Sequence, residues 1–315
     1  MPVTPYIPPR LLGGAHAQTI LASFLVGGAP SWRRARWETP DDDFLDVEIV
    51  EPAVAGAPVV ALMHGLGGST QSGYMRAQTL ELAERGAGVV AVNSRGSSGV
   101  PNRQPRLYHA GETDDLAFVI LTMAARWPGR PLAMIGFSLG GSRLLNFVAR
   151  RPEARMLTRA VAVSAPLDLS ECVDVLDHAR PPLYTRYLLR GLKRILALRP
   201  DLAGAIDYDR ARRAPTVRDF DDAVIAPLHG FASGADYYAR CSAGPALDAI
   251  EGPTLLVRAE DDPFLARSDL RFIEGGNGRG LQVERTAAGG HVGFLGPWLR
   301  PWVQRRAASF VTTAS

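Results

Sequence analysis

Residues 136–140 read G-F-S-L-G, a G-x-S-x-G pattern that places a serine between two glycines. The apolar run Leu132–Ile135 precedes the pattern, and the helix-like run Ser142–Arg150 follows it. On a tight strand-to-helix turn the small glycines let neighbouring backbone approach, and the serine hydroxyl projects beside the helix N-terminus. Developing negative charge is favoured there. The spacing therefore predicts Ser138 as a catalytic nucleophile, against the alternative of a glycine-rich turn that holds an incidental serine.

A serine hydroxyl is a weak nucleophile and needs a base, which a carboxylate in turn orients. When the serine lies on a strand–turn–helix, the chain order is serine, then acid, then histidine. Three histidines follow Ser138. His178 and His229 fall in a stretch without clear strands, whereas His291 lies in the loop G-G-H-V-G-F after the strand-like run Leu281–Arg285. We therefore expect His291 to be the general base.

The acid is expected on the loop after the apolar run Thr254–Val257, where residues 259–264 read A-E-D-D-P-F. Asp262 is the favoured candidate, because the proline directly after it stiffens the turn. Asp261 remains the alternative acid. The carboxylate that is not used is expected to cap the following turn.

Backbone N–H groups that could bind a developing oxyanion are expected in two places. Residues 64–68 read H-G-L-G-G after the apolar run Val59–Met63, and such a turn exposes N–H groups toward the serine. The Leu66 N–H, together with the Leu139 N–H directly after the serine, is predicted to form the oxyanion hole. We expect His64 to be structural, because it comes too early in the chain to be the base.

Strands and helices alternate along the chain, which predicts an α/β fold with a mostly parallel central sheet flanked by helices. Short β-branched runs bounded by turns are typical of strands covered on both faces. Two earlier runs alternate more between apolar and polar residues and are expected to form an antiparallel edge hairpin. The expected strands are Trp32–Glu38, Phe44–Val50, Val59–Met63, Val89–Val92, Leu132–Ile135, Ala160–Val163 and Thr254–Val257. The expected helices between them are Met75–Arg85, Thr113–Arg126 and Ser142–Arg150.

The alternation stops between about Ser170 and Asp248, where helix-like segments replace strands. Because Ser138 precedes this stretch and His291 follows it, both flanks must build one site. The stretch is therefore predicted to be a helical cap or lid inserted into a single sheet domain. The expected division is an N-terminal arm (1–30), a first part of the core (31–169), the cap (170–248) and a second part of the core (249–315). The apolar cap residues are expected to pack a helix on the core, and the alternative is that they form an apolar wall for an acyl chain; they are Leu183, Tyr184, Tyr187, Leu188 and Leu189.

Composition excludes several classes of protein. The 315 residues carry 35 Lys and Arg against 32 Asp and Glu, a net charge of +3 that gives no footprint for nucleic acid. The two cysteines, Cys172 and Cys241, form neither a disulfide framework nor a zinc spacing, and no metal or organic cofactor is implied. No signal peptide is recognisable, and the segment Leu11–Gly28 is too polar to span a bilayer. We expect a cytoplasmic protein whose arm packs on the core, with peripheral membrane contact left open.

Two further patterns are interpreted as structural. His109 and Asp114 form H-x-x-x-x-D, a spacing also found in glycerolipid acyltransferases, but such short motifs are common by chance. The segment precedes a helix, where Glu112 and Thr113 suit an N-cap and a first-turn acid. Arg95 is expected to be solvated or paired with an acid, and not to bind substrate.

Taken together, these motifs resemble the YheT-type branch of the α/β-hydrolase superfamily, which includes bacterial esterases, eukaryotic lipid-acting relatives and yeast medium-chain ester synthases. The resemblance extends over nearly the whole chain. The matching segments are 14–20 (G-A-H-A-Q-T-I), 64–68 (H-G-L-G-G), 93–96 (N-S-R-G), 108–115 (Y-H-A-G-E-T-D-D), 136–141 (G-F-S-L-G-G), 261–264 (D-D-P-F) and 289–294 (G-G-H-V-G-F). The resemblance implies a serine hydrolase acting on carboxylic esters, such as short- to medium-chain acyl or lipid-like esters.

Three alternatives stay open at this stage. The same three side chains would serve an acyltransferase or ester synthase that uses an alcohol in place of water. They would also serve a thioester or amide hydrolase. A catalytically silent binding module is disfavoured, because such a descendant usually has lost one of these groups. The acyl-chain length, the physiological ester and the oligomeric state are not determined by the sequence.

Overall fold

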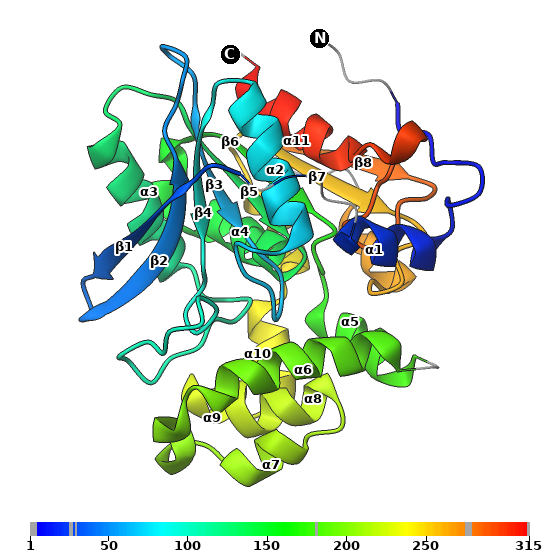
Figure 1. Cartoon of the computed structure of the whole chain (residues 1–315). Helices are drawn as coiled ribbons and strands as arrows, with labels where there is room; N and C mark the ends of the chain where they lie inside the picture. The colour runs from blue at the N-terminus through cyan, green and yellow to red at the C-terminus, as the bar shows by residue number, and fades with distance from the viewer. Residues whose placement is uncertain (1–4, 25–27, 29, 180–181, 275–278, 314–315) are drawn as a thin grey trace.

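The protein is described by a computed structural model that covers residues 5–24, 28, 30–179, 182–274 and 279–313. One eight-stranded sheet lies at its centre, in the order β1-β2-β4-β3-β5-β6-β7-β8 (Figure 1). The strands are β1 (Arg33–Thr39), β2 (Asp43–Val50), β3 (Val59–Met63), β4 (Gly88–Val92), β5 (Leu132–Phe137), β6 (Leu157–Val163), β7 (Thr254–Ala259) and β8 (Leu281–Thr286). Six of them, β3 to β8, run parallel to one another, so the predicted α/β class with a mostly parallel sheet is confirmed.

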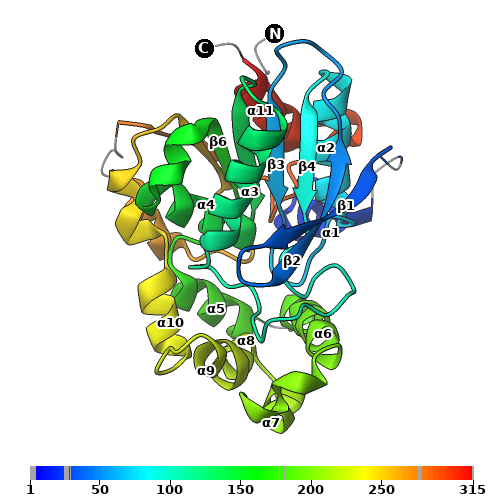
Figure 2. The ribbon, with the colours of Figure 1, turned by 90° about the vertical axis from the view of Figure 1, so that its left-hand side faces the viewer.

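Helices cover both faces of the sheet, and the side chains of one strand show why. Along β3 the side chains alternate between the two faces. Val60 and Leu62 pack with α2 (Gly73–Glu84) and α11 (Trp302–Thr312), whereas Val59 and Ala61 pack with α3 (Asp114–Arg126) and α4 (Leu139–Arg150). Figures 1 and 2 show these two helical layers on opposite sides of the strands.

β1 and β2 form an antiparallel hairpin at the edge of the sheet, as expected, and β2 also pairs antiparallel with β4. Every residue of β2 except Val50 is buried, including its three acids Asp43, Asp46 and Glu48. Asp46 accepts hydrogen bonds from Arg34 and Arg36 of β1. Asp43 pairs with Arg95. Ion pairs therefore offset the burial of two of the three acids of this strand.

A wholly helical segment connects β6 to β7 and lies beyond the carboxyl ends of the parallel strands (Figure 1). Its helices are α5 (Leu169–His178), α6 (Leu183–Ala197), α7 (Tyr208–Arg213), α8 (Val217–Phe220), a π-helical turn (Asp221–Ile225), α9 (Ala226–Leu228) and α10 (Gly234–Cys241). Short 3₁₀ turns occur at Pro152–Met156, Pro200–Gly204, Gly244–Ala249, Arg267–Phe272 and Pro297–Leu299. Because β6 and β7 are adjacent parallel strands, the chain returns from this segment to the same sheet.

Near the N-terminus, α1 (Ala15–Phe24) packs beside α2 and close to the end of β7 (Figure 1). Its Gln18 is fully buried, and the Gln18 side chain bonds the backbone of Leu12 and Leu295. Residues 1–4 of the predicted arm lie outside the described residues. Among the helices of the described residues, none has the length and apolar character needed to cross a membrane.

Candidate active site

Ser138 lies between the end of β5 and the start of α4, in a strained backbone conformation. Its φ is 53° and its ψ is −123°, a region that residues with a side chain rarely adopt. The Ser138 N–H donates to the carbonyl oxygen of Val163 on β6, 2.8 Å away, and this bond holds the turn against the sheet. A Cβ at Gly136 would overlap the carbonyl of Gly140, and a Cβ at Gly140 would overlap that of His64. The glycines of the motif are therefore required by close backbone approach.

This strain predicts a stability effect that is separate from chemistry. Ser138→Gly and Ser138→Ala both remove the hydroxyl, but only glycine accepts the positive φ without cost. Relief of about 1–3 kcal/mol of strain outweighs the roughly 0.5–1 kcal/mol that glycine loses in chain entropy. We expect Ser138→Gly to be about 1 kcal/mol more stable than Ser138→Ala in urea unfolding. Equal or lower stability of the glycine variant would show that the turn is not strained.

The structure brings Ser138, His291 and Asp262 into one hydrogen-bonded chain. His291 Nε2 lies 2.9 Å from Ser138 Oγ, and His291 Nδ1 lies 2.9 Å from Asp262 Oδ2. Because an ionised carboxylate can only accept, Nδ1 must carry the proton and Nε2 must accept from the serine hydroxyl. This chain has the geometry by which a histidine removes a proton from an attacking serine.

Asp261 and Asp262 point to different partners. Asp262 Oδ1 accepts from the Phe264 N–H at 2.9 Å, so the carboxylate that faces His291 also caps the following turn. Asp261 Oδ1 accepts from the Gly290 N–H at 2.9 Å, and burial raises the pKa of Asp261. The expectation that the carboxylate not facing the histidine would cap the following turn is wrong. Asp261 instead ties its loop to the loop that carries His291.

The imidazole of His291 is held from two sides. The Phe264 ring stacks on it with a centroid separation of 4.0 Å and an angle of 3° between the planes. On the backbone side, the His291 N–H donates to Thr19 Oγ1 of α1 at 2.9 Å. Gln18 of the same helix accepts from the Leu295 N–H at 2.6 Å. The early A-H-A-Q-T segment therefore binds both ends of the histidine loop, a function that its sequence alone does not reveal.

We expect Thr19→Val to lower kcat for p-nitrophenyl esters by about tenfold with little change in KM, because a small displacement of a reacting group is costly in rate. Thr19→Ser keeps the hydroxyl and should restore most of the activity. A fall in thermal stability with unchanged kcat, or failure of serine to rescue, would assign Thr19 a purely structural role.

The H-G-L-G-G loop lies directly against Ser138. A Cβ at Gly65 would lie 2.9 Å from Ser138 Cβ. The N–H groups on either side of Leu66 already have acceptors: Gly65 N–H donates to the Tyr74 hydroxyl at 2.9 Å, and Gly67 N–H donates to the Tyr108 hydroxyl at 2.7 Å. The Leu66 N–H has no acceptor among the described residues and is free to bind an incoming oxygen.

His64 is fully buried and fixes this loop. Its Nε2 accepts from the Ser94 N–H at 3.1 Å, so its Nδ1 donates to the Gly65 carbonyl at 2.8 Å. Burial lowers the pKa of His64 to about 4 and keeps the ring neutral. These contacts are consistent with the structural role expected for this histidine.

Charged residues of the N-S-R-G and Y-H-A-G-E-T-D-D segments form buried ion pairs. Arg95 binds Asp43 and Asp115, at 2.6 and 2.7 Å. Arg143 of α4 is completely buried and pairs with Glu112. Sequence reasoning missed Arg143, because an arginine in a helix is normally solvated. The one sequence feature that could have pointed to a role for Arg143 is its position in the helix after the serine, five residues beyond Ser138.

The H-x-x-x-x-D residues have separate partners. The His109 ring lies 4.4 Å from the His229 ring, and burial lowers the pKa of His109 to about 2. Asp114 binds the guanidinium of Arg151 at 3.0 Å. Glu112, and not the Thr113 side chain, accepts from the first turn of α3, through the Asp115 N–H. This arrangement gives the segment a structural explanation.

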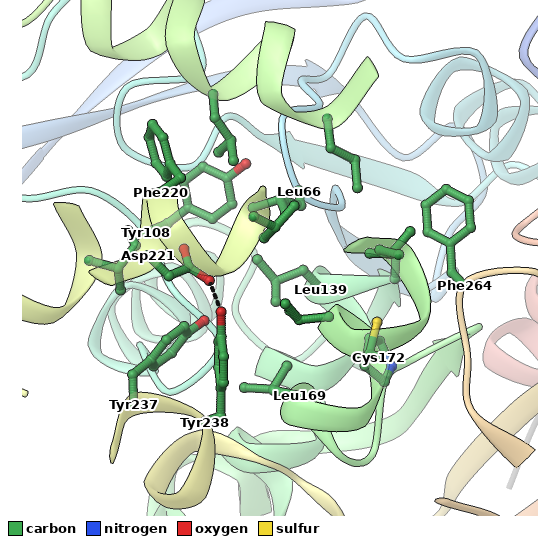
Figure 3. A pocket seen from close by; sticks show the side chains of 18 of the residues that line it. Leu66, Tyr108, Leu139, Leu169, Cys172, Phe220, Asp221, Tyr237, Tyr238 and Phe264 are labelled. Carbon is green, nitrogen blue, oxygen red and sulfur yellow. Dashed lines mark hydrogen bonds between the residues drawn. The ribbon is translucent and has the colours of Figure 1, made fainter. Parts of the chain in front are cut away.

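A narrow cavity of about 60 Å³ opens beside Ser138 and runs between the sheet and the helical segment (Figure 3). Most of its walls are aliphatic or aromatic. Its lining includes Leu66, Leu107, Tyr108, Leu139, Leu169, Leu188, Leu192, Ile195, Phe220, Asp221, Tyr237, Tyr238 and Phe264. Of the five apolar α6 residues expected to pack inward, three are buried (Tyr184, Leu188 and Leu189), whereas Leu183 and Tyr187 are exposed.

The sheet order and the strained serine turn define an α/β-hydrolase fold, and comparison with known proteins agrees. A family model described as alpha/beta hydrolase fold matches residues 58–296. The esterase Pf2001 of Pyrococcus furiosus superposes with a TM-score of 0.60 at 16% identity, covering 98% of each chain. At this level of sequence identity, the structural similarity supports the fold alone.

Proteins similar in sequence define the branch of the family more closely than the structural comparison does. The Escherichia coli (strain K12) protein named "Putative esterase YheT" is 37% identical over 98% of this chain and 93% of its own length. The Mus musculus protein named phospholipase ABHD3 is 27% identical over 94% of this chain and 74% of its own. The Saccharomyces cerevisiae protein named monoacylglycerol lipase is 27% identical over 84% of this chain, which spans 59% of that longer relative. The chain belongs to the α/β-hydrolase family, in its YheT-type branch.

Proposed function

We propose that the protein is a serine hydrolase that cleaves carboxylic esters of short- to medium-chain or lipid-like acyl groups through an acyl-enzyme. The observation that carries this proposal is the chain of hydrogen bonds from Ser138 through His291 to Asp262, at the mouth of an apolar cavity. The relatives named esterase, phospholipase and monoacylglycerol lipase support the same reaction class.

In the first half-reaction His291 takes the proton of the Ser138 hydroxyl as its oxygen attacks the ester carbonyl carbon. The tetrahedral intermediate collapses when the C–O bond to the alcohol breaks, and His291 returns the proton to the leaving alkoxide. Asp262 holds the imidazole in the tautomer that accepts from serine, and it stabilises the imidazolium that forms. In the second half-reaction water attacks the acyl-enzyme with His291 as base, which releases the carboxylic acid and restores Ser138.

Negative charge on the carbonyl oxygen is stabilised by the N–H groups of Leu66 and Leu139. The Leu66 N–H is left available because the tyrosine hydroxyls hold its neighbours, and Leu139 begins α4, whose N-terminus favours negative charge. Preorganised donors of this kind cost nothing to reorient during the reaction.

The helices α5 to α10 act as a cap that shapes the acyl pocket. Leu188 and Leu192 of α6 line the cavity together with Leu66 and Leu139, so an acyl chain bound there would be removed from water. The near-neutral net charge of the chain fits an uncharged ester better than a polyanionic one.

An alcohol acyltransferase or ester synthase is the second candidate, since an alcohol could enter in place of water at the acyl-enzyme. The apolar character of the cavity favours it, because such a pocket disfavours bulk water. Product analysis with an added alcohol separates the two reactions: free acid indicates hydrolysis, and a new ester indicates transfer. A thioester or amide hydrolase would be recognised by its preference among matched ester, thioester and amide substrates.

The experiment that tests the proposal is labelling with a fluorophosphonate, followed by peptide mapping. The expected result is a single adduct on Ser138 and loss of p-nitrophenyl ester hydrolysis in proportion to labelling. Labelling of another residue, or full hydrolysis by the labelled protein, would overturn the proposal.

A further inference from the structure

One acid lies in the wall of the otherwise apolar cavity that opens at Ser138. Asp221 is 6% exposed and lines this cavity together with Phe220, Tyr237 and Tyr238. The Tyr238 hydroxyl donates to Asp221 Oδ2 at 2.7 Å (Figure 3). Asp221 Oδ1 accepts no hydrogen bond from the described residues. A carboxyl group in an otherwise apolar wall, with one oxygen that accepts nothing from the described residues, calls for a functional explanation.

The backbone at this acid is also unusual. Asp221 begins the π-helical turn Asp221–Ile225, and such turns are rare and frequently occur at functional sites. The neighbouring acid Asp222 points elsewhere, since its Oδ1 accepts from the Gly234 N–H at 2.6 Å. Of these two successive acids, only Asp221 lines the cavity.

Asp221 lies at the end of the cavity away from the reacting groups. Figure 3 shows Asp221 and Tyr238 on one side of the cavity and Phe264 on the other, with Leu66, Leu139 and Leu169 between them. Phe264 stacks on the imidazole of His291, so it marks the reacting end. An acyl chain attached to Ser138 and extended along the leucines would direct its far end toward Asp221.

The chemistry around Asp221 selects the group that this far end would carry. Burial raises the pKa of Asp221 to about 7, so both its neutral and its ionised form are accessible near neutral pH. A cationic end is disfavoured by the Arg218 guanidinium, which lies 5.0 Å from the centre of the Tyr238 ring. An anionic end would meet the charge of Asp221 itself. A hydroxyl suits both forms, because it donates to a carboxylate and accepts from a carboxylic acid.

On the basis of the proposed function, we propose that Asp221, supported by Tyr238, binds a hydroxyl group at the far end of the acyl chain, which makes hydroxy-acyl esters the preferred substrate class. A plain chain of the same length would cover Asp221 Oδ1 without offering it a partner. Sites that hydrogen-bond a substrate hydroxyl discriminate strongly against the analogue that lacks it.

The test compares p-nitrophenyl esters of plain acyl chains with their terminally hydroxylated counterparts over a graded series of lengths. The wild-type protein should prefer the hydroxylated ester at one chain length by about tenfold or more in kcat/KM. Asp221→Leu, which is apolar and of similar size, should abolish or reverse this preference while plain esters are still cleaved. Asp221→Asn should keep part of the preference, and Tyr238→Phe should weaken it.

The matched control is Asp222→Asn, which removes an acid from the same turn outside the cavity and should keep the wild-type ratio. Equal kcat/KM for plain and hydroxylated esters at every length, or an unchanged ratio in Asp221→Leu, would overturn the inference. If Asp221→Leu does not fold, the wild-type series together with Asp221→Asn and Tyr238→Phe still tests whether Asp221 binds the hydroxyl of the acyl chain. Failure to cleave either type of ester would instead contradict the proposed function, so the two failures are distinguishable.

Discussion

Ser138→Ala is expected to lower kcat/KM for p-nitrophenyl esters by about 10⁶-fold, because removal of the nucleophile of such a triad costs about as much as removal of the whole triad. The hydroxyl lies 2.9 Å from His291 Nε2, so its removal takes away the nucleophile that the imidazole would activate in the first half-reaction. The measurement is initial-rate kinetics, together with circular dichroism to show that the fold is retained.

A second serine, Ser142 in the following helix α4, provides the control. Ser142 Oγ donates to the Pro166 carbonyl at 2.7 Å and does not contact His291. We expect Ser142→Ala to cost about 1 kcal/mol of stability through the lost hydrogen bond. Its kcat/KM should stay close to that of the wild-type protein. Comparable loss of activity in both variants, or retained activity in Ser138→Ala, would show that Ser138 is not the nucleophile.

Asp262→Asn is expected to lower kcat by about 10⁴-fold, since an amide at this position stabilises the wrong histidine tautomer without moving the side chains. Its N–H₂ group would donate to Nδ1, which leaves the proton on Nε2 and prevents that atom from accepting from Ser138. The effect should fall on kcat, and labelling by a fluorophosphonate should slow in parallel.

Asp261→Asn is the matched control one residue earlier. Asp261 binds the Gly290 N–H, and the amide oxygen of asparagine can accept the same hydrogen bond. We expect less than about tenfold loss of kcat, consistent with a displacement of the histidine loop. A larger effect for Asp261→Asn than for Asp262→Asn would reverse the assignment of the acid.

The local parts of the candidate site could be predicted from the sequence because they depend on neighbouring residues. The glycines around Ser138 and the short apolar run before it predict a tight strand-to-helix turn, and the observed turn has the positive φ that such a motif needs. The order of loops along the chain similarly pointed to His291 and to the pair Asp261 and Asp262. Their catalytic roles remain predictions, whereas their proximity is a property of the structure.

Side-chain direction in the acid loop could not be predicted, because it depends on contacts between distant segments. Asp261 and Asp262 are adjacent and chemically alike, so the sequence could favour one only through the proline that follows. The structure separates them: Asp262 faces the ring of His291, and Asp261 faces the backbone of that loop. The contact of Thr19 with His291 joins residues 272 positions apart, for which no local pattern exists.

The fold class and the loops that carry the candidate catalytic groups could be predicted from the sequence alone, because strand periodicity and turn glycines act over a few residues. The family followed from the resemblance of several motifs. Which side chains meet was set by the folded chain. Packing left the Leu66 N–H without an acceptor among the described residues, because Tyr74 and Tyr108 hold its neighbours, and it placed Asp221 in the wall of the apolar cavity beside Ser138. Hydrogen-bond partners and burial depend on packing between elements that lie far apart in the chain, so no local pattern reveals them.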